Sequence, residues 1–205
     1  MSAPVLLGRF LSPYVRRVAV TLNHFGMAFE RNVISAIGDE EERERANPVG
    51  RVPALILASG ETLIDSAAIL DYLDELAGPD RAIVPPDGEP RRAALRQIAL
   101  ATGAIDRAMA ANAERRRPET QHDPQRQERL LRQAGQGFDA LERDLDGSTW
   151  FDGTELGQAD ITAAIGFTFV NHIFPQTLEA ATLPSLAALT ERCEMLSAFK
   201  NASID

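Results

Sequence analysis

Residues 4–26 read PVLLGRFLSPYVRRVAVTLNHFG, and the prediction of the fold begins with this stretch. The apolar run at residues 4–7 predicts a short β-strand. Apolar residues then recur at helical spacing from Val15 to Phe25, and Gly26 is placed to end the helix. Ser12 stands directly before Pro13, which is a common way for a helix to begin. The stretch therefore predicts a strand, a loop and a helix.

The next part of the chain continues the alternation of strand and helix. Residues 29–34 are predicted as a second strand, and the charged stretch 38–45 as a loop or irregular helix. Residues 54–57 and 62–64 flank Ser59-Gly60, a hairpin signal, and residues 67–76 show helical spacing before Gly78. A strand-helix-strand start implies a parallel pair, to which the hairpin adds antiparallel strands. We therefore expect a mixed four-stranded sheet with helices.

The second half of the chain is predicted to be helical throughout. Residues 79–90 are rich in proline and glycine, which is typical of a linker, and four helical patterns follow it. The predicted organisation is an α/β domain at 1–78, a linker at 79–90 and an all-α domain at 91–205.

Composition and charge exclude several classes of function. The net charge is −9 and the pI about 4.9, which argues against general binding to nucleic acid or anionic membranes. No segment approaches the roughly 20 apolar residues of a membrane span, and the start of the chain lacks a secretory signal pattern. Cys193 is the single cysteine, so an internal disulfide is impossible and a reducing, cytoplasmic location is expected.

Ser12 allows two interpretations. The first is an ordinary helix cap. The second is a site for a thiolate, because a helix N-terminus offers N–H donors and partial positive charge, to which the hydroxyl adds a hydrogen bond. Such a bond to a charged group contributes about 1.5–3 kcal/mol and the helix terminus about 0.3–1 kcal/mol. Together they are sufficient to lower a thiol pKa by roughly two units from about 8.5.

Two further pairs of residues bear on the interpretation of Ser12 as a thiolate site. Val52-Pro53 is either a strand start or a cis-proline bend that turns the Val52 backbone outward to pair with an extended peptide. Asp65-Ser66 is either a plain cap or a second anion site, in which Ser66 holds a carboxylate and Asp65 holds an ammonium group. Together, the three segments suit a peptide-like thiol.

The segments SPYVRRV, NPVGRVPAL, DSAAILDYLDE and LGQADITAAI, in this order, resemble those of cytosolic glutathione transferases. The resemblance covers nearly the whole chain. It implies a thioredoxin-like fold for the first domain, a homodimer, and glutathione as cosubstrate. It further implies that Ser12 stabilises the glutathione thiolate, Val52 binds the cysteinyl part, and Asp65 and Ser66 bind the γ-glutamyl part. Arg51 is a weaker assignment beside the glutathione backbone.

The chain departs from this family pattern at two places. Gly157 stands where the family usually has Ser or Thr three residues before the aspartate, so Asp160 is interpreted as structural. Asp65 replaces the commoner Glu or Gln. In addition, no cysteine lies near Ser12, which disfavours chemistry that needs a protein thiolate.

The favoured hypothesis is a glutathione transferase in which the thiolate attacks a small-molecule electrophile. The cosubstrate pocket is expected at Phe10, Tyr14, Ala108 and Asn112, with an alternative role for Tyr14 in packing between domains. The histidines show no ligand spacing, so no metal is expected. Alternatives are a glutathione-dependent isomerase or reductase, and a non-catalytic dimeric interaction module of the same fold.

Overall fold

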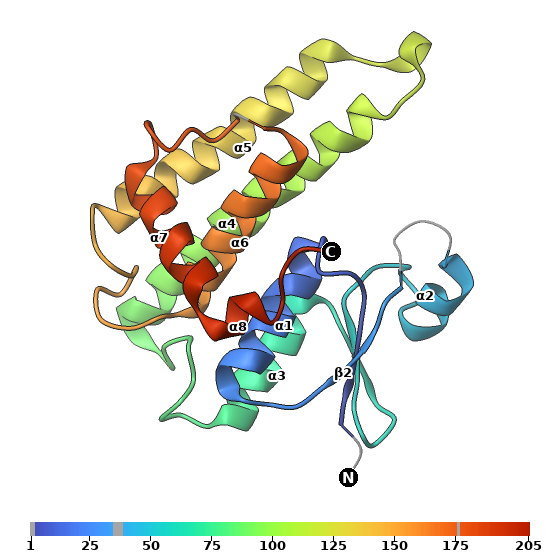
Figure 1. Cartoon of the computed structure of the whole chain (residues 1–205), viewed down its shortest axis with the longest axis vertical. Coiled ribbons are helices and arrows are strands. Elements are labelled where there is room, and N and C mark those ends of the chain that lie inside the picture. Colours follow the sequence, from blue (N-terminus) through green and yellow to red (C-terminus); the bar gives the residue numbers. More distant parts are fainter. Residues whose placement is uncertain (1–2, 35–38, 176) are drawn as a thin grey trace. The chain divides into compact units, whose positions relative to one another are not determined.

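A computed structural model describes residues 3–34, 39–175 and 177–205 (Figure 1). The chain divides into two compact units. The first unit comprises residues up to 83 together with residues 194–205, and the helical unit comprises residues 84–193. Residues 194–205, which the sequence pattern places with the helical part, thus make their contacts with the first unit.

The first unit is built on a mixed four-stranded sheet in the order β2-β1-β3-β4. Its strands are β1 (Val5–Leu7), β2 (Glu30–Asn32), β3 (Ala54–Ile56) and β4 (Thr62–Ile64). β1 and β2 run parallel, and the pairs β1–β3 and β3–β4 run antiparallel. The predicted mixed sheet is therefore confirmed, including the parallel first pair and the hairpin.

The helices of the first unit are α1 (Pro13–Phe25), α2 (Glu40–Ala46), α3 (Ser66–Ala77) and α8 (Ser197–Lys200). α1 ends as predicted, because Gly26 adopts the left-handed conformation with φ of 68°. The core includes apolar side chains of β1, β3, α1 and α3, which become fully buried because these faces are apolar at the strand or helix period: Leu6, Val15, Val18, Leu22, Leu55, Ile69 and Leu73.

Arg16 ties the segment 194–205 to α1. The guanidinium of Arg16 donates to both carboxylate oxygens of Glu194, at 2.8 and 2.6 Å, and to the carbonyl of Ala202 at 2.9 Å. Asn23 adds a bond to the carbonyl of Ala198 at 3.0 Å. Because Arg16 is only 2% exposed, its polar atoms need these partners, and the segment supplies them.

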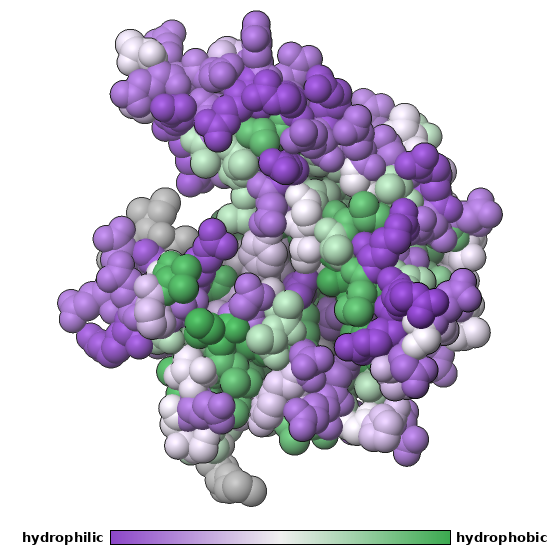
Figure 2. Space-filling model, turned by 180° about the vertical axis from the view of Figure 1, so that it is seen from behind, coloured by the Kyte–Doolittle hydropathy of each residue, from purple (hydrophilic) through white to green (hydrophobic). Residues whose placement is uncertain are grey.

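The helical unit contains α4 (Gly88–Arg115), a 3₁₀ turn η1 (Glu119–Gln121), α5 (Pro124–Leu145), α6 (Gln158–Ile173) and most of α7 (Pro184–Met195). The end of the α4–α5 pair at which the two helices are joined has a hydrophilic surface (Figure 2). α5 begins at Pro124, directly after its cap residue Asp123, and its buried residues are Leu130, Ala134, Phe138, Leu141 and Leu145. Within the described ranges, no helix is both long and apolar enough to cross a membrane.

The buried face of α4 is made mainly of small residues. Ala101, Ala104, Ala108 and Ala111 are buried on it, whereas Leu95 at its start is exposed. Small residues let α5 approach closely, since a Cβ added at Gly137 would lie 2.9 Å from the Cβ of Ala104. The helix is present as predicted, but its packing face follows residue size rather than residue hydrophobicity.

Candidate functional site

Strand register brings the three predicted site segments to one end of the sheet. Leu7 on β1 lies opposite Ala54 on β3, and Ala54 lies opposite Ile64 on β4. Leu7 leads into the loop that ends at Ser12, Ala54 follows Val52-Pro53, and Ile64 leads directly into Asp65-Ser66. Because these three partners form one row across the sheet, Ser12, Val52 and Ser66 extend from the same edge.

Ser12 caps α1 with a long hydrogen bond. Its hydroxyl accepts from the N–H of Val15 at 3.5 Å, beyond the usual 2.7–3.2 Å range. The hydroxyl is half-buried, and α1 has no acidic residue in its first turn. A weakly engaged hydroxyl at a helix N-terminus is able to donate to an anion, so this geometry allows both of the alternatives stated for Ser12.

Gly8 lets the loop before Ser12 pass close to its neighbours. It adopts a φ of 125°, and a Cβ there would lie 2.6 Å from the Val15 side chain and 3.1 Å from Val52. Both the backbone conformation and the lack of space exclude a side chain at this position. The close approach places the Ser12 loop beside the Val52 segment.

The segment before β3 is held by two side chains. Asn47 donates to the carbonyl of Arg51 at 2.9 Å and accepts from the N–H of Val49 at 3.0 Å, while Arg43 donates to the carbonyl of Gly50 at 2.8 Å. The peptide bond between Val52 and Pro53 is cis. Among the described residues, the N–H and C=O of Val52 form no hydrogen bond. Arg51 extends as an exposed side chain.

Asp65 and Ser66 form the start of α3. Asp65 is the cap residue, accepts from the N–H of Ala67 at 2.8 Å, and has a φ of 68°, which is unusual for a residue other than glycine. The Ser66 hydroxyl forms no hydrogen bond within the described part of the chain, although Ser66 is only 5% exposed. Among the described residues this hydroxyl, at a helix start, is therefore not occupied by a protein partner, as the anion-site alternative requires.

Arg17 is a buried cation that sequence reasoning did not single out. Its side chain is buried, and its Nε and Nη1 atoms have no hydrogen-bond partner among the described residues. Burial lowers the pKa of Arg17 to about 10, although the charges of Asp65 and Tyr14 oppose this shift. Arg17 thus remains protonated at neutral pH and adds positive charge near the start of α3. The pair of arginines in SPYVRRV was the available signal, but it does not reveal which arginine lacks partners.

The residues expected in the cosubstrate pocket are divided between the two units. Phe10 is buried and Tyr14 half-buried in the first unit. In the helical unit, Ala108 is buried on α4 and Asn112 accepts a bond from Arg115 at 2.8 Å. Their joint role in one pocket stays a prediction. An open groove of about 780 Å³ runs along α5, but none of the residues lining it belongs to the predicted site.

Asp160 has the structural environment that was expected for it. Its carboxylate accepts from the N–H groups of Phe151 and Gly157, at 2.9 and 2.8 Å. Gly157 has no side chain, so only this reciprocal half of a capping box forms at the start of α6. Burial raises the pKa of Asp160 to about 6, and the N–H donors oppose that rise. No cluster suited to a metal ion is found in the described ranges.

Family models match both parts of the chain. One described as glutathione S-transferase, N-terminal domain, matches residues 11–76, and one described as glutathione S-transferase, C-terminal domain, matches residues 101–196. The chain therefore belongs to the glutathione S-transferase family, as its four segments had suggested.

Individual relatives span most of the chain. It is 30% identical over 174 residues to the uncharacterized GST-like protein YibF of Escherichia coli K12, covering 83% of this chain and 84% of YibF. It is 33% identical over 163 residues to maleylacetoacetate isomerase of Pseudomonas aeruginosa, covering 75% and 74%. The crystal structure of a glutathione S-transferase from Methylobacillus flagellatus with glutathione bound matches it with a TM-score of 0.91 at 29% identity, covering 99% and 100%.

Proposed function

We propose that the protein is a glutathione transferase in which Ser12 stabilises the thiolate of glutathione for attack on an apolar electrophile. The observation that carries this proposal is the row Leu7, Ala54 and Ile64, which gathers three incompletely bonded segments at one edge of the sheet. Solved structures of similar proteins with glutathione bound support glutathione as the ligand.

Each proposed contact uses a group that the fold leaves open. The Ser12 hydroxyl, with its long cap bond, donates to the sulfur. The N–H and C=O of Val52 pair with the cysteinyl backbone in the manner of an added strand. Ser66 and its N–H bind the γ-glutamyl carboxylate, Asp65 binds the neighbouring ammonium group, and the exposed Arg51 lies along the peptide.

The chemistry requires a lowered thiol pKa and an oriented thiolate. Hydrogen bonding by Ser12 and the α1 terminus together lower the pKa by roughly two units, which converts a few per cent of thiolate at neutral pH to a majority. The thiolate forms a bond to the electrophilic carbon, whose leaving group departs with the electron pair, and no covalent enzyme intermediate is needed. Phe10, Tyr14, Ala108 and Asn112 are proposed to contact the electrophile, and a homodimer is the proposed assembly.

A glutathione-dependent isomerase is the second candidate, favoured by the 33% identity to the Pseudomonas aeruginosa protein named maleylacetoacetate isomerase. An isomerase uses the same thiolate, but the sulfur that adds to the substrate leaves again, so free glutathione is regenerated in every turnover. A transferase consumes one thiol per turnover. The loss of free thiol during turnover therefore distinguishes the two.

The first test is calorimetric titration with reduced glutathione, combined with thiolate absorbance across pH. We expect saturable binding and a bound thiol pKa near 6.5 rather than about 8.5. Ser66→Ala should weaken binding about tenfold, because a hydrogen bond to a carboxylate is lost. No saturable binding by the wild-type protein would reject both enzyme candidates and favour the interaction module.

A further inference from the structure

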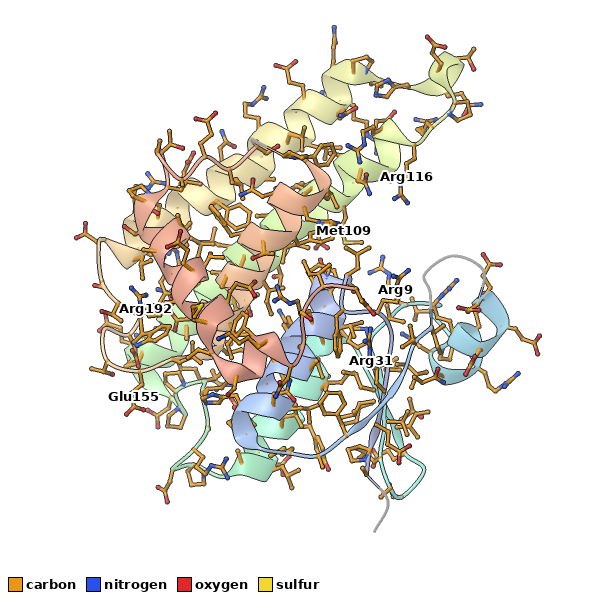
Figure 3. All side chains as sticks on the ribbon, in the orientation of Figure 1. Arg9, Arg31, Met109, Arg116, Glu155 and Arg192 are labelled. Atoms are coloured by element: carbon orange, nitrogen blue, oxygen red, sulfur yellow. The ribbon has the colours of Figure 1, made fainter. Side chains whose placement is uncertain are left out.

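We propose that Asp205 and Arg31 are positioning residues that hold Phe10, Leu11 and Ser12 in the orientation from which Ser12 meets the glutathione sulfur. This inference rests on the proposed function. Neither residue was selected from the sequence, and neither is expected to touch glutathione. Both belong to the first unit, and Figure 3 shows Arg31 in the same part of that unit as Arg9, a residue of the loop before Ser12.

Asp205 links the loop before Ser12 to β2, the outer strand of the sheet. One carboxylate oxygen accepts from the N–H of Leu11 at 3.2 Å, and the other pairs with the guanidinium of Arg31. Leu11 is the residue directly before Ser12. Its N–H has no other hydrogen-bond partner among the described residues, so this carboxylate sets the direction of the peptide that leads into the α1 cap.

Arg31 contacts the same loop at two other points. It lies on β2, opposite Leu6 of β1, so its backbone position is fixed by the sheet. Its guanidinium carbon lies 3.6 Å from the centre of the Phe10 ring, and its Nε donates to the carbonyl of Gly8 at 3.5 Å. The planar guanidinium thus stacks on Phe10 while its far end holds Asp205.

The loop has few other restraints between Gly8 and Ser12. Gly8 donates to the carbonyl of Asn32 at 2.9 Å, and Ser12 donates to the carbonyl of Arg9 at 3.0 Å. Within the part of the chain that the structure describes, the Ser12 hydroxyl has only its 3.5 Å cap bond, so the cap itself restrains that side chain weakly. The orientation of Ser12 therefore depends on contacts made by the residues before it.

The charge state of Asp205 suits this role. Burial alone would raise the pKa of its carboxyl, but the hydrogen bond and charge of Arg31, with Leu11 N–H and Arg9, outweigh it and lower the pKa. Asp205 is consequently ionised at neutral pH. It accepts a charge-assisted bond and compensates Arg31, so the pair adds little net charge beside the thiolate.

The test compares the wild-type protein with Asp205→Asn and Arg31→Lys. Arg31→Lys keeps the positive charge but loses the planar stack on Phe10 and the fork that holds Asp205. Asp144→Asn is the matched control, because Asp144 forms an equivalent pair with Arg96 in the helical unit. Hydrogen exchange at the Leu11 amide, the pKa of the bound glutathione thiol, and kcat and KM are measured for each.

Asp205→Asn should speed exchange at Leu11 about tenfold in ligand-free protein, and raise the bound thiol pKa by about half a unit. Both variants should lower kcat about tenfold with little change in KM for glutathione, whereas Asp144→Asn should match the wild type. If Arg31→Lys has the kcat and KM of the wild-type protein, the positioning role is overturned. An unchanged thiol pKa in Asp205→Asn would also overturn it, whether or not exchange at Leu11 changes. If the wild-type protein does not bind glutathione, the proposed function fails, and unchanged Leu11 exchange would then separately refute the restraint on the loop.

Discussion

Helices α1 and α6 begin with contrasting arrangements of hydrogen bonds, and each arrangement fits a different use. At α1, Ser12 has a side chain able to cap but engages Val15 at only 3.5 Å. At α6, Gly157 has no side chain, yet Asp160 accepts from two backbone N–H groups at 2.8 and 2.9 Å. At α6 the Asp160 carboxylate thus joins the helix start to the backbone that precedes it, as a stabilising contact does, whereas at α1 the Ser12 hydroxyl keeps hydrogen-bonding capacity for a ligand.

Asp160→Ala is the substitution expected to have the largest effect on stability at these two helix starts. Asp160→Ala leaves the N–H groups of Phe151 and Gly157 without their acceptor in a buried site. At about 1–3 kcal/mol for each lost partner, we expect a loss of about 3–4 kcal/mol in the free energy of unfolding at pH 4.5. Urea unfolding measures it. A loss below about 1 kcal/mol would mean that water replaces the carboxylate as acceptor and that Asp160 does not stabilise the start of α6.

The cost of Asp160→Ala should decrease as pH rises. The folded-state pKa is raised to about 6 from 3.8, so the folded protein keeps a proton that the unfolded chain releases. The stability from this group is fully present below pH 3.8 and is lost as pH rises through 6. The expected loss is on the order of 2–3 kcal/mol between pH 4 and 7. Unfolding curves of wild type and variant across pH isolate it, because the other titrating groups are shared.

An increase in the cost of Asp160→Ala with rising pH would also be informative about the start of α6. If the cost of Asp160→Ala grows between pH 4 and 7, the N–H donors stabilise the carboxylate more than burial opposes it. The start of α6 would then favour an anion as strongly as that proposed for α1, and the contrast between the two helices would rest on occupancy alone.

Ser12→Ala should separate activity from stability. Loss of one hydrogen bond to a thiolate, about 2 kcal/mol, should lower kcat/KM about thirtyfold and raise the bound thiol pKa. Removing a Ser cap typically costs about 1 kcal/mol, but the long bond to Val15 places Ser12 near the lower end, about 0.5 kcal/mol. Steady-state kinetics and urea unfolding give the two values. An unchanged pH–rate profile would contradict the role of Ser12, and a large stability loss would show that its cap bond is stronger than its length indicates.

The sequence was informative where structure depends on local pattern. The strand and helix order, the start of α1 at Ser12 and the hairpin follow from periodicity and turn residues, and strand register then places Val52 and Ser66 at one edge. Local pattern therefore predicted both the sheet and the segments of the candidate site.

The remaining features depend on contacts between residues far apart in the chain. Arg31 and Asp205 are separated by 174 positions, and no periodicity links them. Sequence likewise does not separate the adjacent Arg16 and Arg17. The nitrogens of Arg16 are paired, whereas two nitrogens of Arg17 have no partner among the described residues. Residue hydrophobicity alone also does not predict the packing face of α4, because several alanines are buried there while Leu95 is exposed.

Gly157→Ser gives α6 the side chain that α1 already has, and it is the smallest change expected. Gly157 has φ of −110° and ψ of 174°, an extended conformation that serine adopts without strain. A serine there offers an acceptor to the N–H of Asp160 and completes the capping box. Serine is favoured over glycine at an N-cap by only a few tenths of a kcal/mol, so the gain should be of that size. Urea unfolding at pH 7 measures it. A gain above 1 kcal/mol would reveal open donors at α6 and remove the contrast with α1, whereas the expected small gain places the open helix start at Ser12.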